Sequence, residues 1–225
     1  MTALDDLRLA EHGAQLFRGA ALADLPDLRV TLAQLPPDQA GIRLHGMEAL
    51  HRYLAPTGTI GAIACLAVGT FAKPVRAILF DKSAATNWSL GWHQDRTICV
   101  RERIDIPGFG PWSVKAGLHH VAPPIDLLSR MVTLRFHLDD VPATNAPLLI
   151  APGSHRRGRV PESSVSHVVA ECGVIACLAK AGDVWAYSTP ILHASDAARS
   201  PEHRRVLQVD FSADDLPGGL EWLGV

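Results

Sequence analysis

The sequence predicts a mostly β protein with helices at its N-terminus, in which roughly seven or eight short antiparallel strands form a double-sheet jelly roll. From residue 75 onward, short apolar runs are separated by Gly, Pro, Asn or Asp, a spacing typical of strands. Over residues 131–138, polar and apolar side chains alternate, so one face of that strand is apolar and the other polar. A barrel with a partly polar interior is suited to holding a ligand at its open mouth.

Before residue 75 the chain is rich in small residues, and its helical patterns are interrupted by prolines. We expect helices over residues 5–17, 47–53 and 59–68. The expected strands cover residues 75–80, 97–104, 131–138, 147–151, 174–178, 183–187 and 205–211. The sequence thus predicts one domain over residues 1–225, with a helical N-terminal part (1–74), a jelly-roll core (75–212) and a C-terminal tail (213–225).

The composition excludes several classes of protein. Apolar residues make up 48% of the chain and charged residues 20%, so the chain can bury a core and is not disordered. With a net charge of −2 and basic residues clustered only at Arg156, Arg157 and Arg159, nucleic acid is not expected as a partner. No apolar run has the length of a membrane span and no signal peptide is evident, so we expect a soluble, cytoplasmic protein without a membrane partner. The four cysteines form no C-x-x-C pair and are expected to be free core thiols. The sequence does not indicate the oligomeric state.

Two His-x-Asp pairs are candidate halves of a metal site, because this spacing puts two ligand side chains on one side of an extended segment. His93-Gln94-Asp95 follows a glycine and two tryptophans just before a predicted strand, whereas His137-Leu138-Asp139 ends a strand in an acidic turn, which capping explains equally well. His193 offers a third ligand from another strand. Two imidazoles and one carboxylate leave about half of an octahedral iron coordination sphere open for a chelating cosubstrate and dioxygen.

An arginine at the start of the last predicted strand is the candidate carboxylate receptor of the site. Arg204 can grip a carboxylate with its bidentate fork. Its neighbour Arg205 points to the opposite side of the strand, which it shares with Leu207, Val209 and Phe211. Periodicity alone does not decide which of these two faces lies inside the barrel.

Four short segments follow one another in a characteristic order: Trp92-His93-Gln94-Asp95, Ala-Pro-Gly-Ser-His at residues 151–155, His193-Ala194-Ser195, and Arg204 eleven residues after His193. Together they resemble the motifs of the phytanoyl-CoA dioxygenase family of iron(II)- and 2-oxoglutarate-dependent oxygenases. The resemblance runs from about residue 75 to residue 211. The chain departs from the family pattern at Ala146 and Ala194, where glycine is frequent, and these small substitutions leave the metal ligands intact.

The resemblance implies a double-stranded β-helix of the cupin-like type, with iron(II) bound by the catalytic residues His93, Asp95 and His193. Arg204 and Ser195 would hold the distal carboxylate of 2-oxoglutarate, and the family spacing favours Arg204 over Arg205 for this role. Secondary candidates for the cosubstrate pocket are Lys82, Asn87, Thr133 and Arg135.

The implied reaction hydroxylates an unactivated C–H bond of a small molecule and converts 2-oxoglutarate and dioxygen to succinate and carbon dioxide. Asp95 favours hydroxylation, because related halogenases replace this carboxylate with a small residue and bind chloride there. The sequence does not identify the substrate. The alternative is a non-oxidative cupin-like protein, either a metal-dependent isomerase or a small-ligand-binding protein, which would have no need of Arg204.

Other polar and aromatic residues near these motifs have a structural explanation beside the functional one. A histidine in the turn at residues 151–155 is better explained by hydrogen bonds to the backbone than by a place in the site. Two histidines and a lysine after residue 114 either contact substrate or lie in a solvated loop, and two tryptophans either wall the pocket or pack in the core. These residues are His155, His119, His120, Lys115, Trp92 and Trp112.

Overall fold

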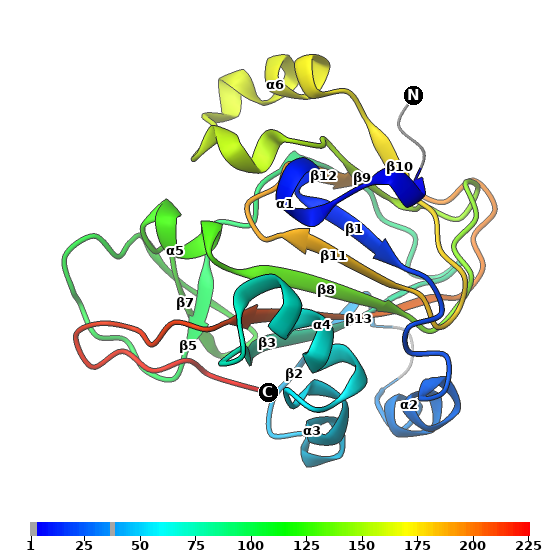
Figure 1. The fold of residues 1–225 in the computed structure, drawn as a ribbon, viewed down its shortest axis with the longest axis horizontal. Helices are drawn as coiled ribbons and strands as arrows, with labels where there is room; N and C mark the ends of the chain where they lie inside the picture. The colour runs from blue at the N-terminus through cyan, green and yellow to red at the C-terminus, as the bar shows by residue number, and fades with distance from the viewer. Residues whose placement is uncertain (1–3, 37–38) are drawn as a thin grey trace.

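Two antiparallel sheets face each other and form the barrel (Figure 1), as the computed structural model shows for residues 4–36 and 39–225. The major sheet has the strand order β1-β11-β8-β13-β3-β2 and the minor sheet the order β10-β9-β12-β4. The major-sheet strands are β1 (Ala14–Phe17), β2 (Gly41–Leu44), β3 (Lys73–Lys82), β8 (Val132–His137), β11 (Val184–Ser188) and β13 (Arg204–Ser212). The minor-sheet strands are β4 (Leu90–His93), β9 (Leu148–Ile150), β10 (Ile175–Cys177) and β12 (His193–Ser195). This arrangement confirms the predicted jelly roll, a double-stranded β-helix.

A third, smaller sheet of order β5-β7-β6 and several short helices complete the described chain. The strands of this sheet are β5 (Ile98–Val100), β6 (Trp112–Lys115) and β7 (Leu118–Val121). The α-helices are α1 (Leu9–His12), α2 (Leu25–Leu32), α3 (Glu48–Leu54), α4 (Thr59–Val68), α5 (Ile125–Ser129) and α6 (Val165–Cys172), and the 3₁₀ helices are η1 (Leu4–Asp6), η2 (Ser154–Arg157) and η3 (Glu162–Ser164). No helix in these parts of the chain is long and apolar enough to cross a membrane.

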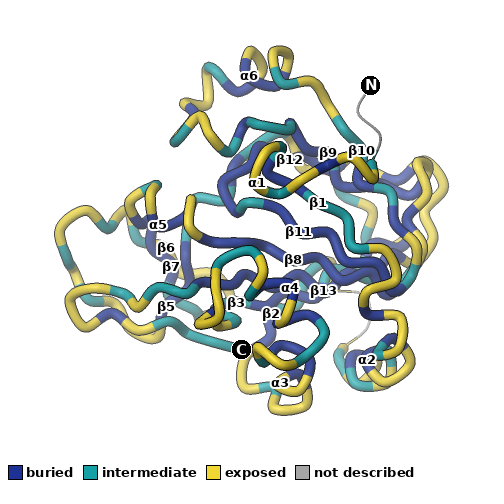
Figure 2. The backbone as a smooth tube through the Cα atoms, viewed as in Figure 1, coloured by how far each residue is buried: buried dark blue, intermediate teal, exposed yellow. Residues whose placement is uncertain are grey.

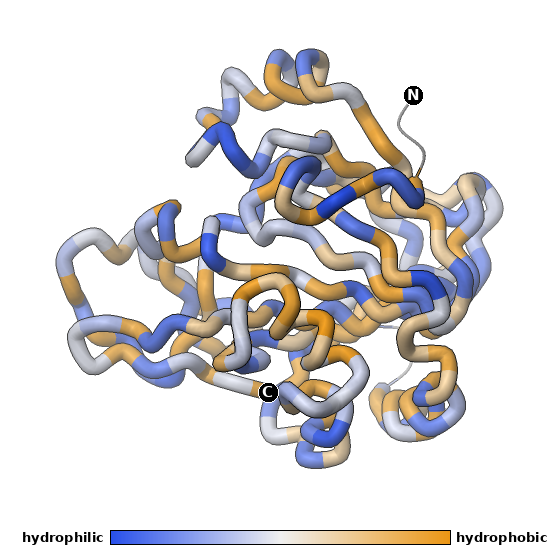
Figure 3. Tube along the Cα trace, viewed as in Figure 1, coloured by the Kyte–Doolittle hydropathy of each residue, from blue (hydrophilic) through white to orange (hydrophobic). Residues whose placement is uncertain are grey.

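The alternation predicted for residues 131–138 sorts side chains between the two faces of the major sheet. Leu134 and Phe136 of β8 point to the outer face, where they pack with Leu207 of β13 and with apolar residues of α2, α3 and α4. Thr133 and Arg135 point into the barrel. Figure 2 shows the major-sheet strands as the most continuous buried part of the chain, and Figure 3 shows the apolar character of α4, which covers them.

The N-terminal part is less helical than the sequence predicts. The helix expected over residues 5–17 is wrong: one short turn, α1, ends at Gly13, and the chain then enters β1, which pairs with β11. Gly13 has a φ of 75°, and a Cβ there would lie 2.2 Å from the ring of His155. A left-handed residue stops the helix and a tertiary contact demands glycine, which helical propensity does not reveal.

Other boundaries differ for local reasons. The helices expected at residues 47–53 and 59–68 are confirmed as α3 and α4. The helix α2 was not expected, and Pro26 lies in its first turn, where a missing N–H is tolerated. The strand expected over residues 97–104 shortens to β5. All four cysteines are free, and Cys99 and Cys177 are buried.

The outer face of β13 generates a stability prediction. Leu207 is 0% exposed within the apolar cluster between the major sheet and the helices, so Leu207→Ala should lower the free energy of unfolding by about 2–5 kcal/mol. Val30→Ala is the control, because Val30 is 67% exposed and should change it by no more than about 0.5 kcal/mol. Urea denaturation of both variants measures the difference, and equal effects would contradict this description of the core.

Candidate metal centre

Two histidines and an aspartate converge where β4 and β12 meet. His93 ends β4 and lies opposite His193, the first residue of β12, in the register of the two strands. Asp95 lies two residues after the end of β4, and its carboxylate is close to the two imidazoles. One ligand atom from each of the three lies within 4.8 Å of the others. No other group of three or more His, Cys, Asp or Glu side chains in the described ranges is arranged in this way.

Both imidazoles are oriented by hydrogen bonds to their own strands. The Nδ1 of His93 lies 2.8 Å from the carbonyl oxygen of Gly91, and the Nδ1 of His193 lies 3.0 Å from that of Ile191. Because a carbonyl can only accept, each Nδ1 carries the proton and each Nε2 keeps a free lone pair. Burial lowers the pKa of His193 to about 4, so this imidazole is neutral at neutral pH.

The carboxylate of the group is paired with an arginine inside the barrel. Arg76 of β3 contacts Asp95 at 3.3 Å and Asp210 of β13 at 2.5 Å. Burial acts to raise the pKa of Asp95, but its surroundings, above all the charge of Arg76, outweigh burial, so the pKa is lowered and Asp95 is ionised. Two carboxylates and one guanidinium leave one net negative charge beside two imidazole nitrogens. This donor set and charge fit a divalent transition metal such as iron(II).

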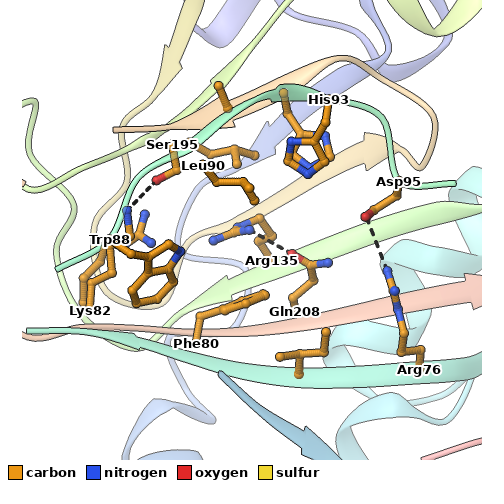
Figure 4. A pocket seen from close by; sticks show the side chains of 15 residues that line it. Arg76, Phe80, Lys82, Trp88, Leu90, His93, Asp95, Arg135, Ser195 and Gln208 are labelled. Atoms are coloured by element: carbon orange, nitrogen blue, oxygen red, sulfur yellow. Dashed lines mark hydrogen bonds and ion pairs between the residues drawn. The ribbon is translucent and has the colours of Figure 1, made fainter. Parts of the chain in front are cut away.

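A cavity of about 120 Å³ extends from this group to the opposite end of the barrel (Figure 4). Asp95 and Arg76 lie at one end, whereas Lys82 and Ser195 lie at the other with Trp88 beside them. Arg135 and Gln208 lie between the two ends. The volume leaves room for roughly ten water-sized groups, about as many as the non-hydrogen atoms of 2-oxoglutarate.

Three buried cations line this cavity: Lys82, Arg135 and Arg204, which are 1%, 6% and 2% exposed. None has a carboxylate of a described residue within ion-pair distance. Burial lowers the pKa of Lys82 to about 7, and the charges of the two arginines act in the same direction. Burial likewise lowers the pKa of Arg204 to about 9. Buried cations without counter-ions are unfavourable, so the cavity favours an anionic ligand.

The hydrogen bonds of these cations leave donors open. Arg204 donates to the carbonyl oxygen of Ala146, and its buried Nε has no acceptor among the residues that the structure describes. The Nε of Arg135 also lacks an acceptor, while its Nη1 donates to Gln208 at 2.8 Å. Lys82 donates to the hydroxyl of Ser195 at 2.9 Å and to a backbone carbonyl at 2.7 Å. Unsatisfied guanidinium donors aimed at a cavity fit a carboxylate cosubstrate.

The structure shows which of Arg204 and Arg205 lies inside the barrel, and where the second His-x-Asp pair lies. Arg205 lies on the outer side of β13 and grips Asp139 with both nitrogens, at 2.9 and 2.7 Å, so Arg204 is the arginine inside the barrel. Asp139 is therefore engaged outside the barrel. Its neighbour in the second His-x-Asp pair, His137, is buried inside with neither ring nitrogen hydrogen-bonded. The structure does not bring this second pair together.

Two predicted cosubstrate contacts lie elsewhere. The Thr133 hydroxyl is 0% exposed and bonds to Asp210 at 3.0 Å and to Thr189 at 3.1 Å, away from the cavity lining. The Asn87 side chain bonds to the backbone of Ala198 and joins two loops.

The six polar and aromatic residues near the motifs, for which the sequence allowed a structural or a functional role, do not line the cavity. The segment after residue 114, for which substrate contact and a solvated loop were both open, is the β6–β7 hairpin, in which His120 is buried and bonds to Leu118 while Lys115 is exposed. His155 packs against Gly13, and its buried Nδ1 has no hydrogen bond, so the expected backbone bond is not formed. The remaining members of this set, His119, Trp92 and Trp112, are half-buried, and both tryptophans pack against apolar clusters.

Sequence reasoning missed Arg76, Asp210 and Trp88. Arg76 and Lys82 are an even number of positions apart in the apolar strand β3, so they fall on the same face of that strand. This spacing could have indicated that Arg76 lies inside the barrel with Lys82. Asp210 shares a strand face with Arg204, which would have placed it inside with that arginine. No comparable signal exists for Trp88, because it lies in a loop before β4.

Several solved structures share this fold at low sequence identity. EctD from S. alaskensis with bound Fe has a TM-score of 0.66 at 17% identity, and the match covers 96% of this chain and 78% of that chain. HygX from Streptomyces hygroscopicus with nickel and 2-oxoglutarate bound has a TM-score of 0.61 at 12% identity, covering 91% and 84%. AviO1 from Streptomyces viridochromogenes has a TM-score of 0.57 at 19% identity, covering 94% of each chain. These similarities establish the fold.

The family is established by sequence. The search of curated proteins found no match to the chain. The family model described as phytanoyl-CoA dioxygenase (PhyH) matches residues 44–206. This range begins at the end of β2 and includes His93, Asp95, His193 and Arg204. The chain therefore belongs to the phytanoyl-CoA dioxygenase family and is an iron(II)- and 2-oxoglutarate-dependent dioxygenase.

Proposed function

We propose that this dioxygenase hydroxylates an unactivated C–H bond of a small molecule, with iron(II) bound by His93, Asp95 and His193. The observation that carries the proposal is a single cavity with this group at one end and Arg204, a buried cation without a counter-ion, at the other. In the balanced reaction one oxygen atom of dioxygen enters the new hydroxyl group and the other enters succinate, with release of carbon dioxide. Bound iron(II) supplies the activation of dioxygen.

The residues at the cationic end bind the cosubstrate. Arg204 presents its fork to the distal carboxylate of 2-oxoglutarate, and the hydroxyl of Ser195 donates a further hydrogen bond to it. Lys82 adds a positive charge beside Ser195. Arg135 lies between the two ends and balances the second negative charge of the diacid. The aromatic rings of Phe80 and Trp88 close the cavity around this ligand and exclude water.

A small-molecule substrate is supported by the structural neighbours and by the cavity. EctD from S. alaskensis was crystallised with 2-oxoglutarate and 5-hydroxyectoine, and HygX was crystallised with nickel, 2-oxoglutarate and hygromycin B. The carboxylate at Asp95 favours hydroxylation over halogenation, because chloride would need the coordination position that it takes. Buried cations opposite the proposed metal ligands match a 2-oxo diacid that chelates the metal, which the oxygenase requires and a non-oxidative metal-dependent isomerase does not.

The metal assignment predicts which substitutions abolish metal binding. His93→Ala, Asp95→Ala and His193→Ala should each lose the visible charge-transfer band that forms when the anaerobic protein receives iron(II) and 2-oxoglutarate, because each removes one of three ligands. Asp139→Ala is the matched control from the second His-x-Asp pair and should keep the band. Loss of the band in Asp139→Ala together with its retention in Asp95→Ala would show that the wrong pair was chosen.

The proposed pairing of Arg204 and Ser195 with the distal carboxylate predicts a graded loss of affinity for 2-oxoglutarate. A charge-assisted pair between a guanidinium and a carboxylate contributes about 1.5–3 kcal/mol, so Arg204→Ala should weaken 2-oxoglutarate binding roughly 10- to 150-fold. Arg204→Lys should recover part of this loss, and Ser195→Ala should weaken binding about tenfold or less. Arg205→Ala, on the outer face, should stay within about threefold of the parent. Titration of the charge-transfer band with 2-oxoglutarate measures the affinity of all four variants. Loss of affinity in Arg205→Ala alone would show that Arg205, and not Arg204, binds the cosubstrate.

The lowered pKa of Lys82 predicts a pH dependence of cosubstrate affinity. Below about pH 7 the ammonium is charged and attracts the diacid, whereas above it the amine is neutral. The affinity for 2-oxoglutarate should therefore fall as pH rises from about 6 to 8.5, with a limiting slope of about one decade per pH unit. Arg204 and Arg135 lower the pKa of Lys82 further, while Asp196 acts in the opposite direction. Lys82→Met should flatten the profile, and an unchanged profile in this variant would exclude Lys82 as its source.

A further inference from the structure

We infer that Arg76 is a positioning residue, which holds one carboxylate oxygen of Asp95 so that Asp95 offers only its other oxygen to the metal. The inference rests on the proposed role of His93, Asp95 and His193 as metal ligands. It concerns a residue that has no ligand role of its own, because both of its interactions are with carboxylates of this chain.

A continuous chain of hydrogen bonds holds Arg76 in place. Its Nη2 donates to Oδ2 of Asp95 at 3.3 Å, and its Nε donates to Oδ2 of Asp210 at 2.5 Å. The other oxygen of Asp210 accepts a bond of 3.0 Å from the hydroxyl of Thr133, which also contacts the hydroxyl of Thr189 at 3.1 Å. Asp210 thus has both oxygens engaged by neighbours, whereas only one oxygen of Asp95 is engaged.

The sheet itself aligns this chain of bonds. In the register of the three central strands, Asp210 of β13 lies opposite Arg76 of β3 on one side and opposite Thr133 of β8 on the other. The side chains of Arg76 and Asp210 are 12% and 4% exposed, so water competes little for their hydrogen bonds. Asp95, in contrast, follows the end of β4 and belongs to no strand. Arg76 therefore ties an irregular segment to the central strands of the major sheet.

The number of open coordination positions depends on how Asp95 binds. A carboxylate can bind a metal through one oxygen or through both. If each of the three ligands supplies one atom, half of an octahedral sphere stays open, which suffices for a chelating 2-oxo acid and dioxygen. A second oxygen from Asp95 would occupy one of those positions. Because Arg76 holds Oδ2, the cosubstrate and dioxygen keep their places.

Arg76 makes its two contacts from two nitrogens of one rigid, planar group. Its Nε reaches Asp210 and its Nη2 reaches Asp95, so the position of each carboxylate is fixed relative to the other. A lysine keeps the positive charge, but its donors sit on one nitrogen at the end of a flexible stem. Arg76→Lys therefore removes the planar fixation of the two carboxylates while it keeps the charge near the metal, and it separates positioning from electrostatic attraction.

The test compares Arg76→Lys with Arg205→Lys, which makes the same substitution in the Arg205–Asp139 pair on the outer face of β13. Anaerobic calorimetric titration with iron(II) should show roughly 10- to 100-fold weaker binding for Arg76→Lys, the usual size of an outer-shell effect. Arg205→Lys should stay within about threefold of the parent. Addition of 2-oxoglutarate should shift the charge-transfer band in Arg76→Lys alone.

Thr133→Val provides a second test that leaves Asp95 and Arg76 in place. Valine has the shape of threonine but donates no hydrogen bond to Asp210, so iron(II) binding should weaken by about two- to tenfold. Thermal unfolding of the metal-free variants is the second readout. Lower stability with unchanged iron(II) affinity and an unshifted band would show a merely structural role and overturn the inference. If Arg76→Lys does not fold, Thr133→Val decides by the same criterion.

These experiments distinguish failure of the metal assignment from failure of the role inferred for Arg76. Absence of iron(II) binding in the parent protein would overturn the metal assignment itself. Normal binding in the parent together with binding within threefold and an unshifted band in Arg76→Lys would overturn only the role of Arg76.

Discussion

The antiparallel register of β3, β13 and β8 is the constraint on which the site depends. It places Arg204 beside Lys82, Gln208 beside Arg135, and Asp210 beside Arg76, all inside the barrel. The same register places Leu207 and its neighbours against the helices. A slip of one residue would exchange the two faces, expelling every polar group and burying the apolar ones. The packing of the outer face therefore determines which charges reach the cavity.

The cavity demands opposite charges at its two ends. At one end two carboxylates face a single guanidinium and two imidazoles, an excess of negative charge that a divalent cation offsets. At the other end Lys82, Arg135 and Arg204 have no carboxylate partner, an excess of positive charge that a diacid offsets. A divalent metal ion and a diacid together satisfy both demands, one at each end of the cavity. The electrostatic arrangement thus accounts for the dependence on both a metal and an anionic cosubstrate.

The sequence predicts the parts of this structure that leave a local pattern. Alternation identified the strand at residues 131–138, and the resemblance to the family's motifs pointed to His93, Asp95 and His193, which the fold brings together. Contacts across strands leave no such pattern in one sequence. The choice between Arg204 and Arg205 depended on packing by residues far along the chain, and the contacts of Arg76 are with Asp210 of β13 and with Asp95 in the segment after β4. The helix expected at residues 5–17 was wrong because Gly13 and His155, distant in sequence, meet in the fold.

The order of strands in the major sheet has a consequence for the making of the protein. β13 lies between β3 and β8, yet ribosomes synthesise it after every other strand of that sheet. Until it emerges, β3 and β8 each present an unpaired edge, and such edges invite pairing with other chains. The contacts that close the sheet also span long stretches of sequence, a property of slowly folding β proteins. The nascent chain is thus most prone to aggregation just before its central strand inserts, and that same insertion assembles the cavity.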